Sequence, residues 1–181
     1  MTQEKGWADP GALGLAGFGL TTLVLNLHNL GLVPTAGFTV AYGYAYGGLA
    51  QVIAGIIDFR RGNMFGGTAF TSYGLFWIGF ALLNTLGLKT SGAELAAWMA
   101  AWGLFTLYLA VAAYVLRSRA VTVVLALLVI LFFMLAAALG LNSSQLLKAA
   151  GAEGVVTALA AIYTSAALLL NNAAGRQVLP V

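Results

Sequence analysis

Long apolar runs, separated by short polar interruptions, occupy almost the whole chain. A helix that crosses a bilayer needs about 20 predominantly apolar residues. Six runs reach that length, at 11–32, 36–58, 66–88, 93–116, 119–141 and 150–172. The interruptions contain Pro34 and the polar segments 60–63, 89–92, 117–119 and 142–145. The pattern predicts an all-α membrane protein, in which residues 1–181 form a single domain of six transmembrane helices.

The distribution of basic residues predicts how these helices are oriented. An even number of helices places both termini on one side of the membrane, together with the second and fourth interruptions. That side carries Lys5, Arg60, Arg61, Arg117, Arg119 and Arg176, whereas the opposite side carries Lys89 and Lys148. Short loops rich in Lys and Arg stay in the cytoplasm. We therefore expect a multi-pass protein of the inner or plasma membrane with both termini cytoplasmic and, without a recognisable cleavable signal, the first helix as its insertion signal.

Composition narrows the classes of function. Hydrophobic residues make up 61% of the chain and charged residues 7%, and there is no cysteine. No Asp, Glu, Lys or Arg falls in the middle of an expected helix, because Asp58 and Glu94 lie at helix ends. A membrane enzyme needs ionisable groups at depth. We therefore expect no enzyme, cofactor, metal site or nucleic-acid partner.

The first expected helix carries a polar face. At about 100° per residue, Phe18, Thr22, Asn26 and Asn29 fall within an arc of roughly 80°. Polar groups in hydrocarbon cost free energy unless they meet partners or water. One reading is that these side chains line a pore; the other is that they bond their own helix or a neighbour. His28 lies off this face, and we expect it to be structural.

The third expected helix offers two polar faces that cannot both line one lumen. Thr68, Thr71 and Ser72 share an arc of roughly 100°, and Tyr73 and Trp77 lie on the far side. Either the hydroxyl face packs against a neighbour and Tyr73 faces the path, or the reverse holds.

The remaining helices carry fewer signals. Between residues 121 and 139 the fifth has one polar side chain, Thr122, so it either faces lipid or contributes apolar groups to a constriction. The sixth has Thr157, Thr164 and Asn171 at seven-residue intervals, either as pore lining, for which Thr164 is our candidate, or as contacts between helices.

The second helix carries Gln51, Tyr42 and Tyr46 and a small-residue pair. Gly43 and Gly47 form a small-xxx-small pattern, which allows helices to approach closely. We expect this pair to contribute to contact between protomers.

Several segments together resemble one known family. The run 9–15, DPGALGL, resembles the NPAPLGL signature of the acetate uptake transporters, the succinate–acetate permeases. The resemblance continues in GFGLTTLVLNLHN (17–29), GGLAQVIAG (47–55), GNMFGGTAFTSYGLFW (62–77) and GRQVLP (175–180). The chain departs from the signature itself, with Asp9 for Asn, Gly11 for Ala and Ala12 for Pro, which affects the expected geometry of the entrance.

The resemblance implies a homo-hexamer in which each six-helix protomer has its own narrow pore for acetate, other small monocarboxylates and, in some members, succinate. It also implies a hydrophobic constriction formed by Phe18, Tyr73 and a leucine of the fifth helix, which we take as Leu128 within 127–131. Tyr73 then faces the lumen. Membrane lipid is the other expected partner. The resemblance leaves open whether the protein is a channel or a proton symporter.

Elementary chemistry favours the neutral acid at such a constriction. A simple carboxylic acid has a pKa near 4, and burying its anion without a cationic partner is costly. Passage of the neutral acid would look like proton symport without any proton relay in the protein. The alternatives are a channel for another small solute, such as urea or ammonia, and a membrane sensor or assembly subunit without flux.

Overall fold

The structure is a computed structural model that describes residues 6–181 as an all-helical bundle. Its elements are α1 (Gly11–Asn29), α2 (Gly37–Tyr44), the π-helical segment η1 (Ala45–Ala50), α3 (Gln51–Arg60), α4 (Met64–Thr85), α5 (Gly92–Val115), α6 (Arg119–Gly140) and α7 (Ser144–Ala174). Because α2, η1 and α3 follow one another without a break, the described chain has six helices that are long and apolar enough to span a membrane. The expectation of six transmembrane helices is confirmed, and Lys5 lies outside the described residues.

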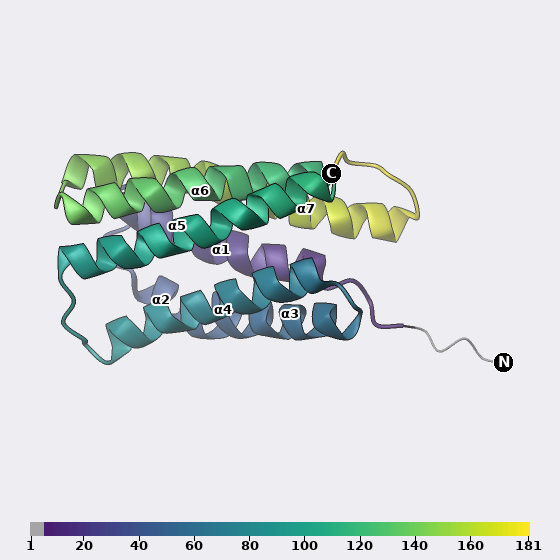
Figure 1. Ribbon diagram of the computed structural model, residues 1–181, viewed down its shortest axis with the longest axis horizontal. Helices are drawn as coiled ribbons and strands as arrows, with labels where there is room; N and C mark the ends of the chain where they lie inside the picture. The colour runs from purple at the N-terminus through teal and green to yellow at the C-terminus, as the bar shows by residue number, and fades with distance from the viewer. Residues whose placement is uncertain (1–5) are drawn as a thin grey trace.

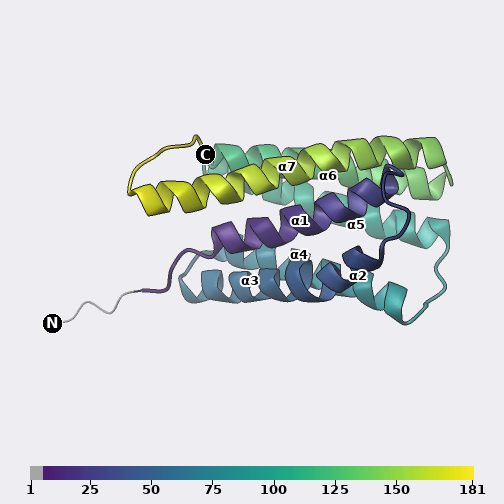
Figure 2. The same cartoon turned by 180° about the vertical axis from the view of Figure 1, so that it is seen from behind.

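The six long helices run side by side and alternate in direction (Figures 1 and 2). The segment leading into α1, the α3–α4 and α5–α6 connections and the segment after α7 all lie at one end of the bundle (Figure 1). The α1–α2, α4–α5 and α6–α7 connections lie at the other end. Residues 9–15 and the loop at 60–63, which are far apart in the chain, therefore share one face of the molecule.

Local sequence explains where several helices begin. Asn63 caps α4 by accepting a hydrogen bond from the Gly66 amide at 3.1 Å. Ser91 and Glu94 form a capping box at the start of α5, with each side chain satisfying the other's backbone amide. Ser143 caps α7, and this helix begins at Ser144, six residues before the start expected from hydropathy. Polar residues in its first turns lower the hydropathy there, so hydropathy placed the start of the helix too late.

Close approach of helices depends on glycines. Gly154 of α7 packs against the Asn26 side chain of α1. Gly43 lies against the Trp77 carbonyl of α4, where an added Cβ would be 2.9 Å from the oxygen, and Gly47 lies against Thr21 of α1. Both glycines of the small-xxx-small pair are thus used inside the protomer, and the expectation that they join protomers is wrong.

The apolar core lies where α1, α4, α5 and α6 meet. The α6 helix buries one face, formed by Val124, Leu125, Leu128, Leu131, Phe132 and Leu135. Of the two alternatives for this helix, the structure therefore favours an apolar contribution to the interior. Large apolar side chains such as Leu104 and Val111 of α5 are exposed, as expected for a surface that meets lipid.

Candidate solute pathway

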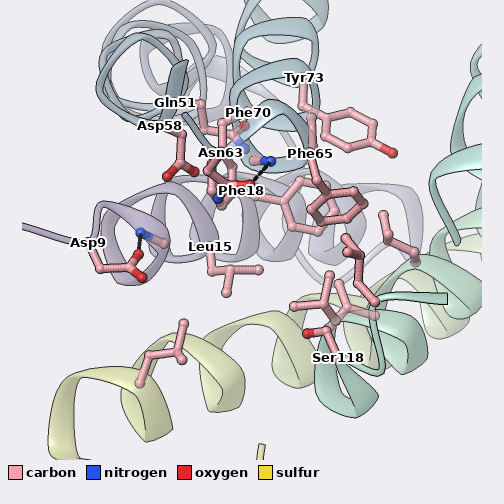
Figure 3. A pocket seen from close by; sticks show the side chains of 18 of the residues that line it. Asp9, Leu15, Phe18, Gln51, Asp58, Asn63, Phe65, Phe70, Tyr73 and Ser118 are labelled. Carbon is pink, nitrogen blue, oxygen red and sulfur yellow. Dashed lines mark hydrogen bonds between the residues drawn. The ribbon is translucent and has the colours of Figure 1, made fainter. Parts of the chain in front are cut away.

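The main pocket opens beside the α3–α4 loop and extends into the bundle. It has a volume of about 280 Å³, near the lower end of the range for ligand pockets. Its lining is mostly apolar, and its polar side chains come from Asp9, Gln51, Asp58, Asn63 and Ser118. Figure 3 shows the first four of these with Phe18 and Tyr73, and Ser118 lies across the pocket from them in this view. A small solute with one polar end fits such a lining.

Two carboxylates that line this pocket, those of Asp9 and Asp58, form ion pairs with Arg61, which does not itself line the pocket. The Arg61 guanidinium lies 3.2 Å from an Asp58 carboxylate oxygen and 3.6 Å from an Asp9 oxygen. Asp58 is 1% exposed, whereas Asp9 is largely open to solvent. Asp9 also accepts a hydrogen bond from the Gly11 amide at 2.7 Å, and so satisfies a free amide at the start of α1 (Figure 3). The aspartate that replaces asparagine in the signature thus holds both α1 and Arg61.

A ring of three apolar side chains closes the inner end of the main pocket. Phe18 of α1, Tyr73 of α4 and Leu128 of α6 are each no more than 5% exposed. The Phe18 and Tyr73 ring centres are 5.8 Å apart, with the planes inclined by 47°. All three residues line the main pocket and also a second cavity beyond it. The structure therefore brings the three expected constriction residues together at the boundary between two spaces.

The second cavity is small and lies on the far side of this ring. Its volume is about 20 Å³, close to the ~10–15 Å³ that one water molecule requires. Thr22, Asn26 and Trp77 line it together with apolar residues of α6. Within the described chain, the Thr22 hydroxyl and the Trp77 indole nitrogen are buried without a hydrogen-bond partner. The main pocket, the ring and this second, inner cavity together form a candidate solute path. The path is narrow at the inner cavity, and its wall there offers polar groups.

Other polar residues of α1 satisfy local bonds. The Asn26 amide donates to the Thr22 carbonyl at 2.8 Å, and Asn29 donates to the Asn26 side-chain oxygen at 3.2 Å. Asn29 itself lines neither cavity. The His28 Nδ1 lies 2.9 Å from the Val33 carbonyl, beyond the end of α1. Local bonding and cavity lining therefore coexist on this helix.

The α4 helix presents its aromatic face to the path. Tyr73 and Trp77 both line the inner cavity, whereas the Thr71 hydroxyl is buried beside Gly55 of α3. The Tyr73 hydroxyl, however, does not point freely into the path. It lies 2.9 Å from Oγ1 of Thr106 on α5, and Thr106 in turn donates to the Trp102 carbonyl at 2.7 Å. The tyrosine thus offers its ring to the path, and its hydroxyl joins α4 to α5.

The polar residues of α7 lie away from both cavities. The Thr164 hydroxyl donates to the Ala160 carbonyl at 2.8 Å, and this residue lines a separate pocket beside Arg119. Asn171 holds the returning C-terminal segment through the Val178 and Leu179 backbone. These hydrogen bonds stay within α7 or join it to the C-terminal segment, so they match neither the pore lining nor the contacts between helices expected for this stripe.

Glu153 is an ionisable side chain that was overlooked when charged residues were expected only at helix ends. It lies within the sixth expected span and is partly buried, so an ionisable side chain does occur inside that span. Its Oε1 accepts a hydrogen bond from Thr157 at 2.8 Å, and its Oε2 is buried without a partner in the described chain. Glu153 lines neither cavity of the path.

Sequence reasoning also missed residues that line the path. Phe76 and Phe132 contribute to the inner cavity, and nothing in their local pattern distinguishes them from other core aromatics. Gln51 was noticeable as the only amide side chain of its helix, but the sequence could not show that it faces the main pocket.

Known proteins resemble this chain over part or nearly all of its length. The succinate-acetate/proton symporter SatP of Escherichia coli strain K12 is 38% identical over 187 residues, covering 96% of this chain and 95% of that protein. A solved structure described as the bacterial acetate channel SatP superposes with a TM-score of 0.91 at 39% identity, covering 97% of this chain and 99% of the other. The ammonia transport outward protein 2 of Saccharomyces cerevisiae is 40% identical over 117 residues, covering 58% of this chain and 42% of that protein.

These relatives share the six-helix arrangement or parts of its sequence, and the main pocket lies among the segments 9–15 and 62–77 that first indicated the resemblance. The family profile described as GPR1/FUN34/yaaH matches residues 1–181. The chain therefore belongs to the GPR1/FUN34/yaaH family.

Proposed function

We propose that this chain is a membrane pathway for acetate, other small monocarboxylates and the larger succinate. The observation that carries the proposal is the ring of Phe18, Tyr73 and Leu128 between the main pocket and the inner cavity. An apolar ring with polar groups on both sides suits a solute that has a short hydrocarbon part and one carboxyl group. The printed functions of the two SatP relatives support the same solute class.

The species that passes the ring is proposed to be the neutral acid. No Lys or Arg of residues 6–181 lines the main pocket or the inner cavity. An ionised carboxylate would lose hydration at the ring without a cationic partner, which is costly. Each neutral molecule carries one proton across the membrane. One mechanism therefore accommodates both the symporter and the channel descriptions given to the relatives.

The residues have distinct proposed roles. Phe18, Tyr73 and Leu128 form the constriction, and Thr22 and Asn26 line the path beyond it. Asn29 contributes through its hydrogen bond to Asn26. Thr164 is assigned no contact with the solute, because its hydroxyl is used within α7. We propose no catalytic activity for the chain.

Uptake into liposomes tests the proposal. Purified protein should accelerate uptake of labelled acetate beyond the rate of protein-free liposomes, and lowering the external pH should increase that acceleration. At fixed pH, a membrane potential imposed with potassium and valinomycin should not change the protein-dependent rate, because the neutral acid carries no charge. A rate that follows the potential would show anion movement, and a rate equal to that of protein-free liposomes would reject the pathway.

Ammonia is the second candidate solute. The yeast relative is named for ammonia transport, and an uncharged ring without lysine or arginine suits a small neutral molecule. A pH-sensitive dye inside the same liposomes would report ammonia entry as internal alkalinisation. Alkalinisation without any acetate uptake would favour ammonia over the monocarboxylates.

We also propose that both termini are cytoplasmic. The end of the bundle that contains the main pocket opening carries Arg60, Arg61, Arg117 and Arg119, which fits the distribution of basic residues expected for cytoplasmic loops. Because the chain lacks cysteine, single cysteines can report the topology. Gln177→Cys should be protected from an impermeant thiol reagent in intact cells, and Thr90→Cys should be labelled.

The proposed assembly is a homo-hexamer in which each protomer has its own path. Support comes from the lining of both cavities by residues of one chain, and from apolar outer faces such as that of α5. Native mass spectrometry in mild detergent should show six copies. Mixed rings of active and inactive protomers should transport in proportion to the active copies. A dimer as the largest species would contradict the sixfold ring.

A further inference from the structure

Gln51 combines complete burial with two unused hydrogen-bonding groups. The residue is 0% exposed, and neither its side-chain oxygen nor its side-chain nitrogen has a partner within the described chain. It lines the main pocket, where Figure 3 shows it with Asp58, Asn63 and Phe18. Burial of an amide without partners costs free energy. An apolar side chain of the same length would avoid that cost, so packing alone does not account for a glutamine.

The backbone places this amide beside the constriction. Gln51 is the first residue of α3, directly after the π-helical segment η1, and π-helical turns frequently occur at functional sites. A Cβ on Gly17 of α1 would lie 3.4 Å from Cγ of Gln51 and 2.6 Å from the Tyr46 carbonyl. The glutamine is thus packed closely against the residue that precedes Phe18. Gln51 lines the main pocket but not the inner cavity, so it lies on the outer side of the ring.

The chemistry of a primary amide matches that of a protonated carboxyl group. A glutamine side chain offers an N–H donor and a carbonyl acceptor in one plane. A protonated carboxyl group offers a carbonyl acceptor and an O–H donor with the same spacing. The two groups can form two antiparallel hydrogen bonds, and rotating the amide by 180° preserves the match. An ionised carboxylate has only acceptors, so its second oxygen would face the amide oxygen without a proton between them.

We propose that Gln51 is the specificity residue that recognises the protonated carboxyl group of the solute before it passes the ring. This inference rests on the proposed function and deepens it, since it assigns the preference for the neutral acid to one side chain. Acetamide is the informative probe. It has the size of acetic acid, stays neutral at every working pH and presents the same donor and acceptor pair to the glutamine.

The experiment compares the parent protein with two variants in liposomes. Gln51→Met keeps the length of the side chain and removes both hydrogen-bonding groups. Thr39→Val is the matched control, because Thr39 is also 0% exposed with an unpartnered hydroxyl on the same membrane-spanning helix but lies outside the pocket. Acetate uptake is measured at an external pH of about 5, with and without acetamide as competitor.

The proposal predicts that Gln51→Met raises the half-saturating acetate concentration about tenfold, equivalent to ~1.4 kcal/mol, and removes inhibition by acetamide. Thr39→Val should change neither quantity. Equal half-saturating concentrations in parent and Gln51→Met, or equal inhibition by acetamide, would overturn the proposal. So would a parent protein that transports acetate but is not inhibited by acetamide.

Two further measurements keep the test decisive. If Gln51→Met does not yield folded protein, Gln51→Leu replaces it. Leucine also lacks hydrogen-bonding groups, so inhibition by acetamide should be lost, and retained inhibition would overturn the proposal. If the parent moves no acetate, the proposed function fails, and calorimetric titration with acetamide then decides on Gln51 separately. Binding by the parent and not by the Gln51 variant supports the site, and equal binding or no binding rejects it.

Discussion

The hydroxyl oxygen of Tyr73 on α4 lies 2.9 Å from Oγ1 of Thr106 on α5. Thr106 uses its own proton in a hydrogen bond to the Trp102 carbonyl, so Tyr73 is the donor in the pair. Both residues are buried, and the Tyr73 ring lies beside Phe18 and Phe105 at the same time. One side chain therefore narrows the path with its ring and joins two helices with its hydroxyl.

Tyr73→Phe should separate these two roles. Loss of the hydroxyl removes one buried hydrogen bond, so we expect the variant to be less stable by about 0.5–1.5 kcal/mol. Because the ring remains, acetate uptake should stay near the parent level. Thermal unfolding in detergent and liposome uptake measure the two effects. Tyr108→Phe, whose side chain is exposed, is the control. A loss of uptake with unchanged stability would show that the hydroxyl acts on the solute.

Phe18→Ala should widen the constriction. The ring of Phe18 contacts both the main pocket and the inner cavity. One methylene in a fitted pocket changes discrimination by about tenfold or more, so the rate of butyrate relative to acetate should rise by about that factor. Competition uptake with acids of increasing length measures the change. Phe133→Ala, which removes a partly exposed ring from α6 outside the path, should retain the parent selectivity. Unchanged selectivity in both variants would mean that Phe18 only packs.

His28→Gln should leave the pH dependence of transport intact. The His28 Nδ1 lies 2.9 Å from the Val33 carbonyl, and the side chain lines neither cavity. Glutamine retains a donor but does not titrate, whereas histidine changes charge near pH 6–7. Uptake between pH 5 and 8 would follow the fraction of neutral acid in parent and variant alike. A flattened profile in the variant would identify His28 as a proton-sensing group.

Substitutions of Arg61 and Asp9, at the opening of the main pocket, should differ in their effect on stability. Asp58 is buried against Arg61, so Arg61→Gln leaves a charged group with fewer partners and should cost about 1–3 kcal/mol of stability. Asp9 is exposed, and its pair with Arg61 at 3.6 Å should contribute only about 0–1 kcal/mol. Asp9→Asn also retains an acceptor for the Gly11 amide. Equal destabilisation by the two changes, measured by thermal unfolding, would contradict this difference.

The periodicity of single helices was enough to predict much of the candidate site. Phe18, Thr22 and Asn26 lie on one face because of the 3.6-residue repeat, which holds for any α-helix whatever its neighbours. Their shared position beside the inner cavity follows the arc expected from the sequence. The six apolar runs were equally evident, because each transmembrane helix satisfies its own backbone hydrogen bonds and must be long and apolar.

The choice between faces needed the neighbours of each helix. Helical periodicity left Tyr73 and Thr71 as equal candidates for the path, and the family resemblance favoured Tyr73. In the structure Thr71 packs against Gly55 of α3, which agrees with that choice. Gly43 and Gly47 suggested contacts between protomers, but Trp77 and Thr21 occupy the space beside them in the same chain. A small residue in the sequence indicates that another helix packs closely there, but it does not identify that helix.

The sequence by itself determined the class of the protein, its six apolar helices and the polar face of the first, because these follow from hydropathy and helical repeat along one segment. The family resemblance implied that Leu128 meets Phe18 and Tyr73, whereas only the tertiary structure decided that Thr106 takes the tyrosine hydroxyl and that Gln51 faces the pocket. These relations join residues of different helices. They depend on the rotation and spacing of each helix in the bundle, which the packing of all six helices sets together.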